Sequence, residues 1–99
     1  MTATDHRQAA KAAVENIIAL LKADAQPATV ASLIAECEAL VRAIGAFHME
    51  GIRFRMFNVD RQLARTDLAL SAEVRARFAD ARHELEAAGF HTRSHQAPT

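Results

Sequence analysis

The residues best suited to chemistry lie in the middle of the chain, around His48. This histidine stands four residues after Ile44 and four before Ile52, so on a helix it would share their apolar face. Charged side chains and phenylalanines follow it closely, a mixture typical of a pocket or a partner surface between helices. The candidate binding residues are therefore Phe47, His48, Glu50, Arg53, Phe54, Arg55, Asn58 and Arg61. The other interpretation is a buried, neutral, hydrogen-bonded histidine beside a solvated helix face.

Phosphotransfer is a minor alternative for the histidines. Phosphotransfer domains carry lysine and glycine at the third and fourth positions after their histidine, whereas Gly51 and Ile52 follow His48 there. The segment Ala-Asp-Ala-Arg-His-Glu-Leu at 79–85 resembles part of the phosphoacceptor box of sensor histidine kinases, but that box continues Arg-Thr-Pro and this chain continues Glu-Ala-Ala. No nucleophile lies at a recognisable spacing from a base and an orienting carboxylate, so we expect no catalysis.

Metal ligands are sparse. Asp80, His83 and Glu84 or Glu86 approach the spacing of ligands on one helix, but a di-iron bundle needs a Glu-x-x-His pair on each of two facing helices. The single cysteine, Cys37, lies on an apolar stripe and excludes a disulfide or a cysteine-based zinc site. We therefore expect neither a metal nor another cofactor.

The charges balance, which argues against two classes of partner. Twelve basic and twelve acidic residues give a formal net charge of zero, so no net field attracts nucleic acid or anionic lipid. Acidic neighbours offset the arginines at 53, 61 and 65. No apolar run approaches the ~20 residues of a membrane span, and the first residues lack the apolar core of a signal peptide. We expect a cytoplasmic protein that binds neither nucleic acid nor membrane.

Capping residues mark the two terminal helices. A first helix is expected to extend to about residue 23. Its N-terminus can be capped by side-chain oxygens of Thr2, Thr4 or Asp5. Ser71 precedes a last helix. That helix should end where Gly89 adopts the left-handed conformation and Phe90 returns to Leu85. We expect a single helical domain over 1–90 and a disordered tail over 91–99.

A longer apolar stripe occupies the middle of the chain. It consists of Val30, Ile34, Cys37, Val41, Ile44, His48, Ile52, Met56, Val59 and Leu63. Because these residues fall at steps of three and four without a proline, the pattern predicts one helix over about 28–65. The fold class is then all-α, with three helices of which the middle one is roughly twice as long as the others.

A turn between Gly45 and Gly51 is the alternative, and it would give a monomeric up-down four-helix bundle. Against it, residues 46–50 contain no Ser, Thr, Asp, Asn or Pro to restart a helix. With an unbroken helix, each half of the chain would be a two-helix hairpin that cannot enclose a core. We then expect an elongated, antiparallel homodimer, acting as a small interaction or regulatory protein. The alternative function is a small-molecule or metal-binding bundle with His48 in a pocket between helices.

Overall fold

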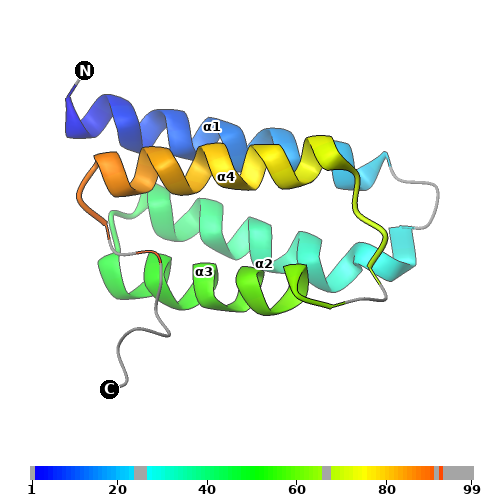
Figure 1. Cartoon of the computed structure of the whole chain (residues 1–99). Helices are drawn as coiled ribbons and strands as arrows, with labels where there is room; N and C mark the ends of the chain where they lie inside the picture. Colours follow the sequence, from blue (N-terminus) through cyan, green and yellow to red (C-terminus); the bar gives the residue numbers. More distant parts are fainter. Residues whose placement is uncertain (1, 24–26, 66–67, 91, 93–99) are drawn as a thin grey trace.

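The computed structural model describes residues 2–23, 27–65, 68–90 and 92, which form four α-helices. They are α1 (Ala3–Lys22), α2 (Pro27–Gly45), α3 (Met49–Leu63) and α4 (Ala72–Ala87). Successive helices run antiparallel, so the start of α1, the α2–α3 turn and the end of α4 lie at one end of the bundle, on the left in Figure 1. The all-α class is confirmed, and the four-helix alternative fits the chain.

The single long helix predicted for the middle of the chain is wrong, because the chain reverses between α2 and α3. The N–H of Phe47 donates to the Ile44 carbonyl (3.1 Å) and that of His48 to the Ala43 carbonyl (3.0 Å), the two bonds of a Schellman closure. Phe47 takes the left-handed position, with a φ of 57°. The His48 side chain then caps α3, since its Nδ1 accepts from the Gly51 N–H at 2.7 Å. Phe47 therefore holds a left-handed position that glycine usually occupies, and His48 holds an N-cap position that Ser, Thr, Asp or Asn usually occupies.

The expected caps form at the outer helices. Thr2 makes a capping box at the start of α1, with its hydroxyl accepting from the N–H three residues further on. Ser71 caps α4 in the same way, at 3.2 Å. At the end of α4, Gly89 has a φ of 97° and the Phe90 N–H donates to the Leu85 carbonyl at 3.0 Å. The predicted Schellman closure is therefore confirmed.

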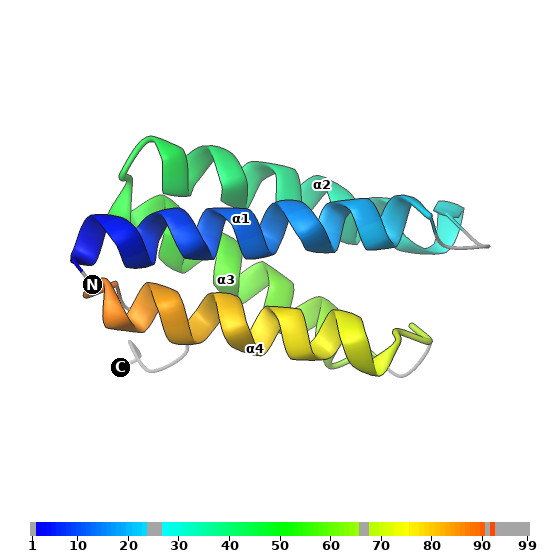
Figure 2. The same ribbon diagram turned by 90° about the horizontal axis from the view of Figure 1, so that it is seen from above.

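The core is enclosed within one chain. Its largest fully buried side chains include Ile17 and Leu21 of α1, Leu40 of α2, Met56 of α3 and Leu85 of α4. α1 packs against both α2 and α4, and α2 packs against α3. Figure 2 shows α1 between α2 and α4, with α3 crossing behind. Thr92 is also buried, at 1% exposure, while the rest of the predicted tail lies outside the described residues.

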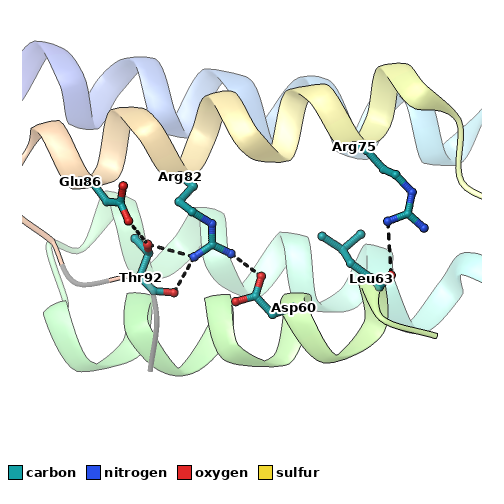
Figure 3. A network of polar contacts seen from close by, with 6 residues as sticks. All are labelled: Asp60, Leu63, Arg75, Arg82, Glu86 and Thr92. Carbon is teal, nitrogen blue, oxygen red and sulfur yellow. Dashed lines mark hydrogen bonds and ion pairs between the residues drawn. The ribbon is translucent and has the colours of Figure 1, made fainter. Parts of the chain in front are cut away.

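The seam between α3 and α4 is closed by long side chains. No Cα atoms of these two described helices come within 8 Å of each other. Arg82 of α4 binds Asp60 of α3 through one guanidinium nitrogen, and the other donates to the carbonyl and hydroxyl oxygens of Thr92 at 2.9 and 3.0 Å (Figure 3). Arg75, two turns earlier, donates to the Leu63 carbonyl at 3.3 Å. Two arginines on one face of α4 therefore span the seam.

The overall dimensions of the single chain are compact. The radius of gyration is 12.8 Å and the principal extents are 37 × 31 × 21 Å, close to the ~13 Å radius expected for this length. An unbroken central helix would be about 58 Å long, more than the longest extent of the chain, so the helix on which the elongated dimer was predicted is absent. The homodimer itself stays a prediction. Because four helices of one chain cover the apolar stripe, burial no longer demands a second copy.

Candidate functional site

An open groove with a volume of about 380 Å³ lies between α2 and α3. It is lined by Ser32 and Glu36 of α2, by Asn58, Arg61 and Gln62 of α3, and by Arg65 just beyond α3. These residues recur at steps of three and four beside the buried stripes of their helices, which directs them to one side of the α2–α3 pair. The groove is polar and carries more positive than negative groups.

Polar contacts cross the groove floor. The Glu36 carboxylate accepts from Arg55 Nη1 at 3.4 Å and from Asn58 Nδ2 at 3.3 Å. One turn away, Gln62 Nε2 donates to Ser32 Oγ at 2.8 Å. The Gln62 Oε1 atom is buried and accepts no hydrogen bond. A buried carbonyl oxygen without a donor costs free energy, and because this atom is enclosed, a bound molecule would reach it only after the Gln62 side chain moved.

The outer face of α3, beside the groove, carries two stacked pairs of arginine and phenylalanine. The Arg55 guanidinium lies 5.1 Å from the centroid of the Phe54 ring, which is 53% exposed. The Arg61 guanidinium lies 5.8 Å from the centroid of the half-buried Phe57 ring. Stacking on the ring restricts each guanidinium without using its N–H donors, of which Arg55 already gives one to Glu36.

The predicted candidates divide between two places. Asn58 and Arg61 line the groove, Arg55 and Phe54 lie at its edge, and Arg53 is half-buried on α3. The groove residues Ser32, Glu36 and Gln62 were not predicted, and Arg65 was considered only for nucleic acid. The α2 and α3 residues of the groove become neighbours only because the chain reverses between the two helices. Residue spacing along one continuous helix therefore could not predict the groove.

Phe47, His48 and Glu50 lie instead at the α2–α3 turn, and all three are exposed. The interpretation of His48 as a core residue in line with the apolar stripe is wrong, because the turn removes it from that stripe and uses its ring as a cap. Phe47 makes an edge-to-face contact with Phe90 (centroids 5.3 Å apart) and lies beneath the Arg7 guanidinium at 5.3 Å. The turn is thus an aromatic contact between helix ends, outside the groove lining.

Within the described residues, no group of three or more His, Cys, Asp or Glu side chains is placed to hold a metal ion. Burial, followed by the charges of Glu36 and Glu38, raises the pKa of the Cys37 thiol to about 12, which leaves it un-ionised and a poor nucleophile at neutral pH. The His6 Nδ1 lies 2.6 Å from Glu84 Oε1, a pair between α1 and α4 that the sequence pattern did not indicate. The phosphotransfer alternative is untouched by these observations and stays a prediction.

Comparison with known proteins yields no relative: no family model matches the chain, and no curated protein or solved structure matches it significantly. None of the described helices combines the length and the apolar character needed to cross a membrane.

Proposed function

We propose that the chain is a small interaction protein, without catalysis of its own, that binds an acidic segment of another protein along the α2–α3 groove. The observation that carries the proposal is the pair of arginine and phenylalanine stacks on α3, directly beside a polar groove. Aromatic and arginine side chains are enriched at the energetic centres of protein interfaces. Phe54 is outside the core and 53% exposed, so a partner that covered it would bury a large apolar ring.

The charges favour an acidic partner. Among the described residues that line the groove, Glu36 is the one carboxylate, and Arg55 already pairs with it. Arg61 and Arg65 add two positive charges to the same lining. A guanidinium binds a carboxylate through two parallel hydrogen bonds, and the stacking of Arg61 on a ring lowers the entropy lost on binding.

The groove also offers contacts for a peptide backbone. The exposed Ser32 hydroxyl, which accepts from Gln62, can donate its own hydrogen to a backbone carbonyl. An apolar side chain next to the acidic residue would cover Phe54 and Phe57. The expected ligand is therefore a short segment that alternates carboxylates with large apolar residues.

Location and assembly belong to the proposal as well. A cytoplasmic location suits a chain whose one cysteine, Cys37, is unpaired and buried. We also propose homodimer formation as a second interaction. Burial of the core does not drive it, because the core is already buried within one chain, but the α2–α3 turn would allow two chains to associate.

A peptide-display selection against the purified protein tests the binding proposal. Enriched peptides should combine Asp or Glu with Leu, Ile or Phe. Their affinity should fall at least about tenfold in Phe54→Ala and in Arg61→Ala, as expected for residues at the centre of an interface. Arg77→Ala, on the exposed face of α4, is the matched control and should bind normally. Failure to enrich any peptide, or enrichment of peptides whose affinity ignores both α3 variants, contradicts the proposal.

A further inference from the structure

The turn between α2 and α3 holds an unfavourable backbone conformation. Phe47 has a φ of 57°, and it is the one described residue other than glycine with a positive φ. Left-handed backbone is disfavoured for a side chain with a Cβ atom. The equivalent position at the end of α4 is occupied by Gly89, which adopts its φ of 97° without that penalty.

The closed turn also depends on the absence of a side chain at position 51. A Cβ atom on Gly51 would lie 2.6 Å from His48 Nδ1 and 3.4 Å from the Ala43 Cβ. The first distance is too short for any real contact, so a side chain there must displace the capping ring. Gly45 differs, because a Cβ atom there would meet nothing closer than Lys11 Cε at 3.8 Å.

The apolar stripe continues in phase across the turn. Buried Ile44 ends the stripe of α2 and buried Ile52 begins that of α3, eight residues apart with His48 midway. If residues 46–48 became helical, these side chains would fall on one face of a single helix. The sequence therefore encodes two compatible conformations of this segment, bent and straight.

The contacts divide the molecule at this turn. The half formed by α3 and α4 meets the half formed by α1 and α2 through the α1–α4 and α2–α3 packing, whereas the described parts of α3 and α4 have no close Cα approach to each other. Each half thus presents its apolar surface to the other half. The α3–α4 half of a second copy would fit the same surface with the same residues.

We propose that the α2–α3 turn is a hinge, and that a second copy of this chain binds by exchanging its α3–α4 half. In this swapped dimer α2 and α3 form one continuous helix. The α1–α4 and α2–α3 interfaces are rebuilt between two chains, while the α1–α2 packing stays within each chain. Short hinge loops under strain favour such exchange. The occupant of the surface is the chain itself, because no other partner reproduces both the α1–α4 and the α2–α3 packing.

Two variants should shift the equilibrium toward the dimer. Gly51→Ala displaces the cap that only the bent form needs, and His48→Ala deletes the same cap. Loss of the His48 cap should shift the opening equilibrium of each hinge roughly fivefold. Because a swapped dimer contains two hinges, its dimerisation constant should rise by about 25-fold. Gly45→Ala is the control, because it adds the same helix-favouring methyl group at a position that accommodates it in both forms. The proteins are refolded at high concentration and weighed by light scattering after gel filtration.

A crosslink distinguishes exchange from side-by-side association. His6 and Glu84 lie on different halves, touch at 2.6 Å, and are each about a quarter exposed. With cysteines at both positions, a short bismaleimide should join two chains in a swapped dimer, but one chain to itself in the monomer or in a side-by-side dimer. Cys37 is buried and does not compete. Dimers that separate into single chains on a denaturing gel overturn the proposal. So does a monomer mass for wild type, Gly51→Ala and His48→Ala at every soluble concentration.

Discussion

Replacing Arg82 by methionine should open the seam between α3 and α4. The side chain is 14% exposed and makes three polar contacts, one with Asp60 and two with Thr92. Methionine keeps most of the aliphatic stem and removes the guanidinium, so the change isolates the polar contacts from the packing of the stem. The described parts of α3 and α4 have no Cα atoms within 8 Å of each other, and the other polar contact across the seam is that of Arg75 with the Leu63 carbonyl.

The magnitude follows from what each partner loses. A hydrogen bond to a charged group contributes about 1.5–3 kcal/mol. Asp60 is one-third exposed and is rehydrated when its partner leaves, so its share is small. Thr92 is buried, and although its hydroxyl still donates to Glu86 Oε2, its carbonyl loses a donor. The expected loss is about 2 kcal/mol, or about 8–16 °C in Tm for a domain of this size.

Urea unfolding followed by far-ultraviolet circular dichroism measures the loss. The matched control is Arg77→Met on the same helix, because Arg77 is 45% exposed and its ion pairs with Glu73 and Asp80 are those of a solvated surface. It should change the free energy of unfolding by less than about 0.5 kcal/mol. If the two substitutions lowered the free energy of unfolding equally, the reasoning would be refuted, because the Arg82 contacts across the seam would then contribute no more than a surface ion pair.

Two further predictions concern single positions. The free energy of unfolding should fall as pH rises from about 9 to about 12, by up to about 1.4 kcal/mol per pH unit, because the unfolded thiol of Cys37 ionises near 9 while burial holds the folded pKa at about 12. Cys37→Ala should remove that slope in pH-dependent urea titrations, and an unchanged slope would assign it to other groups. Gly89→Ala should cost about 1–2 kcal/mol in the same assay, because a Cβ atom there meets no neighbour and only the positive φ is penalised. Gly45→Ala should cost nothing, and equal costs at the two glycines would contradict the backbone argument.

The amphipathic pattern predicted the core better than it predicted the topology. Cys37, Ile44, Ile52 and Met56 are buried as the stripe indicates, because a stripe at steps of three and four points inward whether the helix is straight or folded in two. The turn between Gly45 and Gly51 was only the alternative prediction, because its left-handed position is held by Phe47 instead of glycine. At the end of α4, where glycine does hold it, the closure was predicted correctly.

The candidate site was less predictable for a related reason. Asn58 and Arg61 were found because they lie near apolar residues along α3. Their neighbours Ser32 and Glu36 come from a different helix, and only the tertiary fold brings them within reach. Hydrophobic periodicity identifies the apolar and polar faces of a single helix. A groove forms where the faces of two helices meet, and periodicity does not show which helices pack together.

The contact between His6 and Glu84 has a consequence for chain connectivity. It brings the first turn of α1 beside the last turn of α4, so the two ends of the helical domain are neighbours in space (Figure 1). Proteins with adjacent ends generally accept circular permutation. A short linker joining these ends, with new termini cut between α2 and α3, would turn the helix order into α3–α4–α1–α2 while leaving each packed pair in place. Such a permutant has no Phe47 strain to store and no covalent hinge to open, and it would fold as a monomer whatever the concentration.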